Sequence, residues 1–220
     1  MSGISRHSRK TEIWPQPKTQ CDLADFPLKV HGAVGFRTAL GPAVCGGYKE
    51  KRCFVYQQHQ WIPFPPLKTR REFASAIEVN SHQTLIIGGK EKIGHYSLDL
   101  KSTELITSSG SEEGKDFPVT IQAHCSFKIN STHGLVTAGV QDRSFSASTW
   151  FVELTTSTFT PGPAMKNKRM WHGCTTFHLG SKSYGIVSGG YDGTLLMPPT
   201  EIIDLNQESL TWTEGIQEKP

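Results

Sequence analysis

The chain has 220 residues, 36% of them hydrophobic, which is enough for one large domain or two small ones with a buried core. The formal net charge of +3 is small for this length, so the overall charge indicates neither a nucleic-acid-binding protein nor one that binds an anionic membrane. No apolar run approaches the roughly 20 residues that span a bilayer, so we expect a globular protein without a membrane anchor.

The amino terminus is basic and polar, and no apolar segment follows it. Residues 1–10, MSGISRHSRK, are predicted to be disordered and show no signal peptide. The next segment, TEIW at 11–14, resembles TEII at 200–203, and Cys21 follows it at about the distance of an outer strand. Residues 11–30 are therefore predicted to form two strands of an incomplete sheet.

A short apolar strand that ends in small residues recurs four times along the chain. The copies are PAVCGG at 42–47, TLIIGG at 84–89, GLVTAG at 134–139 and GIVSGG at 185–190. The closing glycines, Gly47, Gly89, Gly139 and Gly190, are 42, 50 and 51 residues apart. Recurrence at this interval indicates a repeat architecture built from small sheets.

Each copy has further strand signals on both sides. The segments upstream are HGAVGF, FASAIEV, AHCSFKI and HGCTTFHL, and those downstream are CFVYQQHQW, HYSLDLKSTEL, WFVELTTSTF and EIIDLNQESLTW. Alternating apolar residues and polar turns predict four antiparallel strands per copy, the last one bearing Trp61, Leu105, Phe159 or Trp212. The second copy departs most, because it has Leu105 for the aromatic and an apparent insertion, SSGSEEGKDFP, while the third has Ala138 for the first glycine.

This pattern resembles the kelch repeat, the blade of a β-propeller, from about residue 31 to residue 215. The resemblance implies an all-β fold, a kelch-type propeller of four-stranded antiparallel blades, whole or incomplete, over residues 11–220. The expected divisions are a partial blade at 11–30 and blades at about 31–67, 68–118, 119–165 and 166–220. Three explanations of the ring stay open: a truncated six-bladed propeller, a five-bladed ring with a partial blade, and an open array that dimerises.

The glycines and the bulky outer residues are expected to have structural roles. A residue without Cβ permits close backbone approach where blades crowd together, and a large apolar side chain fills the space between blades. The predicted structural residues are Gly46, Gly47, Trp61, Gly88, Gly89, Gly139, Phe159, Gly189, Gly190 and Trp212.

A basic face is the candidate binding surface. In a propeller blade, the loops from the second to the third strand and the connections between blades emerge on one side, and loops on a rigid scaffold commonly carry function. The candidate residues are Tyr48, Lys49, Lys51, Arg52, Arg70, Arg71, Lys90, Lys92, Arg143, Arg169, Tyr191 and Asp192. They predict a protein partner with an acidic or phosphorylated segment, with an ordinary solvated rim of mixed charges as the alternative.

The sequence offers no catalytic constellation that we can assign. His172, Cys174 and His178 share one face of a predicted strand, but the spacing along a strand is too long for easy joint metal coordination, and His31 and His124 are read as sitting at comparable places in their repeats. We expect no metal and no cofactor. The alternative from another class is an enzyme on a kelch propeller, such as a galactose-oxidase-like copper oxidase.

Five cysteines without a CxxC pair are read as buried, reduced residues, which together with the missing signal peptide favours a cytoplasmic protein. The triplet Asn130-Ser131-Thr132 is an acceptor pattern for N-glycosylation and supports the alternative of a secreted protein whose signal peptide is missing from this chain. The kelch resemblance implies a non-enzymatic interaction scaffold, with a ubiquitin-ligase adaptor or a cytoskeletal protein as intracellular versions. Nucleic acid and membrane are not expected as partners.

Overall fold

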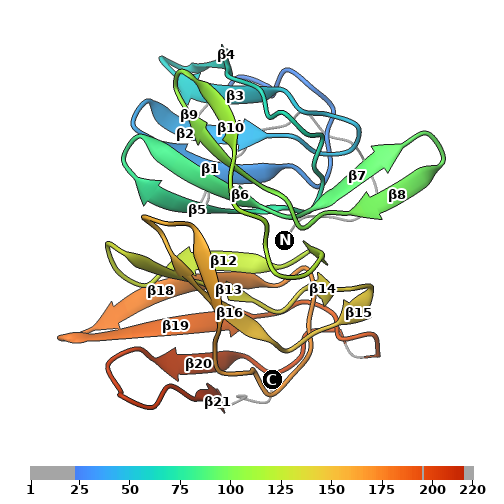
Figure 1. Cartoon of the computed structure of the whole chain (residues 1–220). Coiled ribbons are helices and arrows are strands. Elements are labelled where there is room, and N and C mark those ends of the chain that lie inside the picture. Colours follow the sequence, from blue (N-terminus) through green and yellow to red (C-terminus); the bar gives the residue numbers. More distant parts are fainter. Residues whose placement is uncertain (1–22, 195, 216–220) are drawn as a thin grey trace.

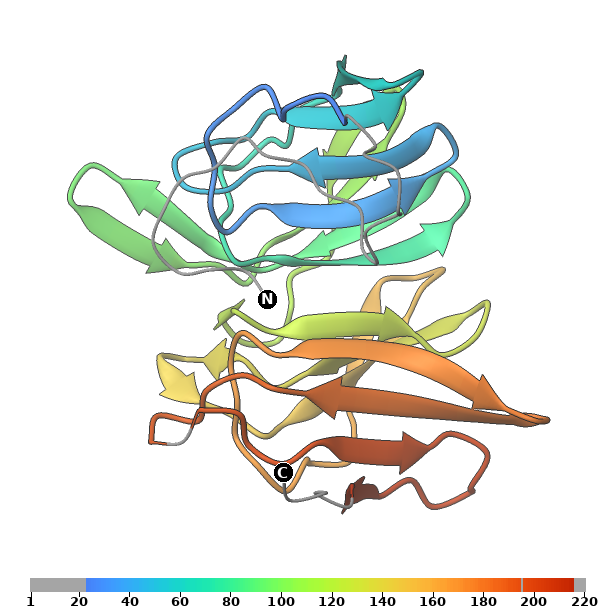
Figure 2. The same cartoon turned by 180° about the vertical axis from the view of Figure 1, so that it is seen from behind.

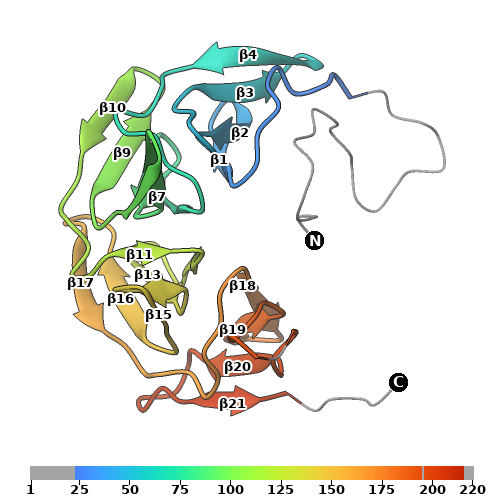
Figure 3. The ribbon, with the colours of Figure 1, turned by 90° about the vertical axis from the view of Figure 1, so that its right-hand side faces the viewer.

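The computed structural model describes residues 23–194 and 196–215, and the regular elements in these ranges are all β-strands (Figure 1). Four four-stranded antiparallel sheets, called blades 1 to 4 below, follow one another along the chain and are arranged in an arc (Figure 3). No helix capable of crossing a membrane occurs within the described ranges.

In blades 1, 3 and 4 the four strands pair in the order in which they follow one another along the chain. Blade 1 contains β1 (Val34–Thr38), β2 (Gly41–Cys45), β3 (Cys53–Gln57) and β4 (Gln60–Phe64). Blade 3 contains β12 (Cys125–Lys128), β13 (His133–Thr137), β16 (Thr149–Glu153) and β17 (Thr158–Pro161). Blade 4 contains β18 (Gly173–Leu179), β19 (Lys182–Ser188), β20 (Glu201–Asp204) and β21 (Trp212–Glu214).

Blade 2 has the same order, β5-β6-β9-β10, but a separate hairpin interrupts it between its second and third strands. Its strands are β5 (Ser75–Asn80), β6 (Gln83–Ile87), β9 (Thr103–Thr107) and β10 (Gly110–Glu113), and the hairpin consists of β7 (Lys90–Ile93) and β8 (Tyr96–Asp99). A small three-stranded sheet, made of β11 (Ile121–Gln122), β14 (Val140–Gln141) and β15 (Ser144–Phe145), lies beside blade 3. Its hairpin β14–β15 lies between the second and third strands of blade 3, the place that β7–β8 has in blade 2.

The hairpin overturns the predicted alignment of the second copy. Leu105 lies in the third strand, and the segment interpreted as an insertion contains the fourth strand, β10. The position that matches Trp61 and Phe159 is Ser111, because Tyr56↔Trp61, Val152↔Phe159 and Ile106↔Ser111 are equivalent cross-strand pairs. The alignment failed because apolar and polar residues alternate along the hairpin in the same way as they do along a true third strand.

The hydrophobic core lies between neighbouring blades, which face each other like stacked layers (Figures 1 and 2). Val55 of blade 1 packs in one cluster with Ile86 of blade 2, and the next cluster joins blades 2 and 3. In the third cluster, Phe127 of blade 3 packs with Ile203 and Trp212 of blade 4. Because each cluster needs two sheets, no blade has a core of its own.

Backbone hydrogen bonds repeat at the three junctions between blades. The amide N–H at the end of each second strand donates to the connection that enters the next blade, from Gly47 to Arg71 O (2.7 Å), and equivalent bonds run from Gly89 and Gly139. A Cβ on Gly46 would lie 2.6 Å from Arg71 O, and Gly46 has a φ of 67°. Glycine is favoured there because a side chain would be strained by the left-handed backbone and would meet the carbonyl oxygen of the next blade's entry.

The predicted amino-terminal features fall mainly outside the described residues. This is the case for the disordered segment at 1–10 and for most of the partial blade at 11–30, including 11–14 and Cys21. Residues 23–29 contain no strand.

Candidate protein-binding face

The connections from the second to the third strand of each blade, and those from one blade to the next, emerge on the side that faces the viewer in Figure 3. We call this side the loop face. It is formed by residues 46–52, 88–102, 138–148 and 189–200 in the four blades, with the entries to the blades at 30–33, 68–74, 119–124 and 166–172. Hairpin β7–β8 projects from this face (Figure 1).

Two predicted binding residues, Arg71 and Arg169, are buried, with exposed fractions of 1% and 0%. Arg71 Nε donates to Glu104 Oε1 at 2.9 Å, and Arg71 Nη1 donates to the carbonyl oxygens of Gly88 and Ser102. The assignment of Arg71 to an exposed binding surface is therefore wrong. The arginine lies four residues before the first strand of its blade, where its side chain turns inward to pair with the third strand.

Arg169 repeats this arrangement in blade 4. Its Nη2 donates to Glu201 Oε1 at 2.8 Å, and its Nη1 donates to Gly189 O at 3.0 Å. The assignment of Arg169 to the exposed face is wrong for the same reason. A signal for both pairs was present in the sequence, because the dipeptide Thr-Glu occurs at 103–104 in blade 2 and at 200–201 in blade 4, with each glutamate just over 30 residues after its arginine.

The other predicted residues lie at or near the surface. Lys49, Lys51, Arg52, Arg70 and Arg143 are exposed, and Tyr48, Lys90, Lys92, Tyr191 and Asp192 are half-buried. Arg52 donates to both carboxylate oxygens of Glu50, and this pairing lowers the pKa of Glu50 to about 2. The charge of Arg52 is therefore largely compensated, whereas exposed lysines such as Lys49 supply positive charge without such a pair among the described residues.

A row of aromatic rings crosses the loop face. The His31 ring stacks on Tyr48 with centroids 5.0 Å apart and lies 6.2 Å from Phe73, and Phe73 lies 6.1 Å from Trp171. Phe73 and Trp171 belong to the entries of blades 2 and 4. They can approach each other because the matching residue of blade 3, between them, is the small Ala123.

Tyr48 is the one member of the row that the sequence predicted as a binding residue, and the row itself was not predicted. Backbone hydrogen bonds link the equivalent residues, from Phe73 N to Gly32 O, from Ala123 N to Phe73 O and from Trp171 N to Ala123 O, at 2.8 to 2.9 Å. This register also corrects the assignment of His31 and His124 to comparable places. His31 comes one residue before Gly32, the linked residue of blade 1, and therefore matches Glu72. His124 and His172 come one residue after the linked residues of blades 3 and 4.

Positive charge and a buried carboxylate border the aromatic row. Lys49 Nζ lies 5.3 Å from the centroid of the Tyr48 ring, which is a cation–π contact. Glu72 Oε2 lies 3.4 Å from His31 Nε2. Burial raises the pKa of Glu72, and the nearby charges of His31, Lys90 and Lys92 oppose that rise. The face thus combines flat apolar rings with lysines around them.

No protein-family profile and no curated protein matches the chain. Among solved structures it is similar to the one entitled "Structure of YjhT", a β-propeller protein, with a TM-score of 0.73 and 12% sequence identity over 90% of this chain and 68% of that one. The chain has a β-propeller fold. At this identity the similarity shows the fold of the propeller and nothing about its activity.

The remaining histidines of interest are inside the propeller. Nε2 of His124 is 2.7 Å from Ser75 Oγ, and Nε2 of His172 is 2.9 Å from Thr137 Oγ1, so each ring joins its blade to the preceding one. Burial lowers the pKa of both to about 3, helped by the charge of Arg169 near His172. Among the described residues, no group of three or more His, Cys, Asp or Glu side chains is placed to hold a metal ion.

Four of the five cysteines are paired, contrary to the expectation of reduced thiols. One disulfide joins Cys45 to Cys53, and the other joins Cys125 of blade 3 to Cys174 of blade 4. The first closes the loop that carries Tyr48 and Lys49. The expectation failed because Cys45 and Cys53 are cross-strand partners across that loop, which their separation in sequence does not reveal.

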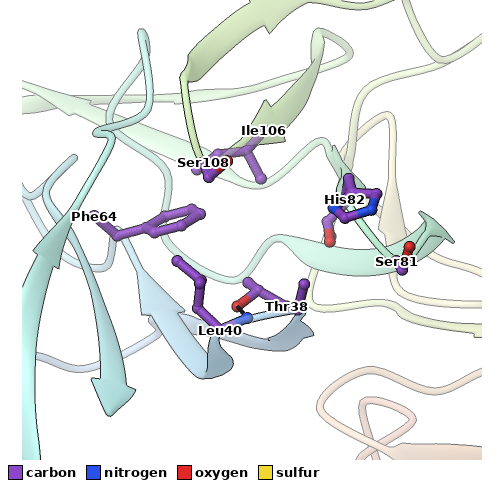
Figure 4. A pocket seen from close by; sticks show the side chains of 9 residues that line it. Thr38, Leu40, Phe64, Ser81, His82, Ile106 and Ser108 are labelled. Atoms are coloured by element: carbon purple, nitrogen blue, oxygen red, sulfur yellow. Dashed lines mark hydrogen bonds between the residues drawn. The ribbon is translucent and has the colours of Figure 1, made fainter.

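A shallow cavity of about 150 Å³ lies between blades 1 and 2 on the side away from the loop face (Figure 4). Leu40, Phe64 and Ile106 give it an apolar wall, and His82 is the titratable residue in its lining. None of the predicted binding residues contributes to it.

Proposed function

We propose that this protein is a kelch-repeat protein that binds a partner protein through its loop face and catalyses no reaction. The observation that carries the proposal is the aromatic row of Tyr48, His31, Phe73 and Trp171. Trp171 is 47% exposed although it is large and apolar. Exposed aromatic residues held on a rigid scaffold are typical of the energetic centre of protein interfaces.

The surrounding charge supports an acidic or phosphorylated partner segment. Lys49, Lys90 and Lys92 border the row, and exposed arginines such as Arg70 and Arg143 lie on other loops. Lysine and arginine attract carboxylates and phosphates and accelerate the encounter with them. Hairpin β7–β8 adds an exposed apolar surface made of Ile93, Tyr96 and Leu98, which a longer partner segment can also contact.

The two disulfides help to distinguish a secreted interaction protein from an intracellular one. Disulfides persist in secreted proteins and are rare in the cytosol. They favour a secreted interaction protein over the intracellular ligase-adaptor and cytoskeletal roles that the kelch resemblance implies.

A peptide-binding experiment tests the proposal. Labelled peptides of one length, carrying either acidic, phosphorylated, neutral or basic residues, are titrated with the protein and followed by fluorescence anisotropy. We expect the acidic and phosphorylated pools to bind best. Trp171→Ala should weaken their binding by about tenfold, because one interface aromatic contributes more than 1 kcal/mol, and K90A/K92A should weaken it most at low salt.

The matched control is Lys182→Ala, which removes an exposed lysine from the first position of β19, on the opposite side. It should leave binding unchanged, and thermal melting should show that all variants are folded. Equal binding of the acidic and neutral pools would contradict the acidic partner, and equal effects of K182A and W171A would contradict the assignment of the face.

A further inference from the structure

The turn between β12 and β13 carries the triplet Asn130-Ser131-Thr132, in which all three residues are exposed. This is the one Asn-x-Ser/Thr triplet in the chain. The turn joins the first and second strands of blade 3, so it lies at the end of the blade away from the loop face (Figure 1).

The side chain of Asn130 is held in one orientation by its oxygen. Asn130 Oδ1 accepts hydrogen bonds from the backbone N–H groups of Thr132 (2.9 Å) and His133 (2.8 Å), and from the Thr132 hydroxyl (3.1 Å). Within residues 23–194 and 196–215, no hydrogen bond engages Asn130 Nδ2. The nitrogen that a glycan would modify is therefore accessible, and the threonine hydroxyl already contacts the amide.

The disulfides are an independent sign of the compartment in which such a modification occurs. Cys45 and Cys53 are buried and paired, and the Cys125–Cys174 bond joins two blades. Such bonds form in the oxidising lumen of the secretory route, where N-glycosylation also takes place. Neither the disulfides nor a glycosylation site is expected to form or be modified in a protein that stays in the cytosol.

We propose that Asn130 carries an N-linked glycan and that the protein matures in the secretory route. The co-reactant is a lipid-linked oligosaccharide diphosphate. Asn130 Nδ2 forms a bond to C1 of the first sugar and loses one proton to the solvent, while the bond from C1 to the diphosphate oxygen breaks and the lipid diphosphate leaves with the electron pair. The glycan projects from the side opposite the loop face, so partner binding stays unobstructed.

Blade 2 offers a matched control in the same turn. Asn80-Ser81-His82 joins β5 to β6, is exposed like its counterpart, and has His82 N donating to Asn80 Oδ1 at 2.9 Å. It differs in lacking a hydroxyl at the third residue, and Asn80 Nδ2 donates to Gln83 Oε1 at 3.1 Å on the exposed surface. His82→Thr should therefore create a second glycosylation site at an equivalent place.

The first experiment is translation of the chain behind a cleavable leader in the presence of endoplasmic-reticulum microsomes, with and without a peptide N-glycosidase. We expect one glycosidase-sensitive step in mobility for the natural sequence, none for Asn130→Gln or Thr132→Ala, one for Ser131→Ala, and two for His82→Thr. A single step with His82→Thr and none with the natural sequence would overturn the site at Asn130.

The second experiment uses the protein isolated from its natural source. Glycosidase treatment should convert Asn130 to Asp, and alkylation before reduction should leave Cys45, Cys53, Cys125 and Cys174 unlabelled. An unmodified Asn130, or four alkylated thiols, in the native protein would overturn the proposal even if the microsome test succeeds.

Discussion

Arg71 and Arg169 each carry a full charge inside the propeller, and each is matched by a glutamate from the third strand of its own blade. Glu104 also accepts hydrogen bonds from the backbone N–H groups of Lys68 and Thr69, so the pair ties the entry of blade 2 to the body of that blade. In blade 3 the corresponding place is apolar, with Ile121 in one cluster with Trp150. Removing one ion of such a pair is costly because the other charge stays buried without compensation.

Arg71→Met should lower the free energy of unfolding by about 3–5 kcal/mol, because it leaves Glu104 buried and unpaired. The double variant R71M/E104Q should be less destabilised, since glutamine removes the buried charge and its one amide oxygen still accepts from one of the two backbone N–H groups, Lys68 or Thr69, that donate to the two oxygens of Glu104. Urea denaturation measures both, with Arg70→Ala as the control on the adjacent exposed arginine, expected within about 0.5 kcal/mol of the natural protein. A loss for Arg71→Met no greater than for Arg70→Ala would contradict the structural role of the pair.

The strands that could be predicted from the sequence are those whose ends depend on residues close by in the chain. The second strands of the blades end at Gly46, Gly88 and Gly189 because the turn needs a left-handed backbone, and this requirement leaves a visible glycine. Hairpin β7–β8 could not be distinguished from a third strand by sequence, since apolar and polar residues alternate in both. The aromatic row was equally hidden, because Phe73 and Trp171 are about 100 residues apart and meet only across the small Ala123.

The entries to blades 3 and 4 should make stability depend on pH. His124 and His172 have folded pKa values of about 3, below the ordinary value of 6.5, so the unfolded chain binds more protons between these limits. Stability should therefore fall as the pH is lowered from about 6.5 to 3, by up to about 1.4 kcal/mol per pH unit for each histidine. Urea denaturation at several pH values should show a weaker dependence for H124Q/H172Q than for the natural protein, and parallel curves would contradict this cause.

The whole molecule is an arc in which the two end blades differ from the inner ones (Figure 3). At the first two junctions the entry of the next blade packs on the glycine that ends the second strand, with Arg71 O on Gly46 and Ile121 O on Gly88. A Cβ on Gly189 of blade 4 would meet no atom within 4 Å among the described residues. The same backbone turn is therefore crowded inside the arc and open at its end, and a substitution there reports whether another blade covers it in solution.

Gly46→Ala and Gly189→Ala should differ in cost if the end of blade 4 is open. Both residues have a left-handed backbone, with φ of 67° and 72°, which costs an alanine about 1–2 kcal/mol. Ala138 already occupies this place in blade 3 with a φ of 53°, so that conformation is tolerated. Gly46→Ala should cost about 1–3 kcal/mol more, because its Cβ also meets Arg71 O. Equal losses in thermal unfolding would contradict the difference between a covered and an open turn, and light scattering would then show whether a second copy of the chain covers blade 4.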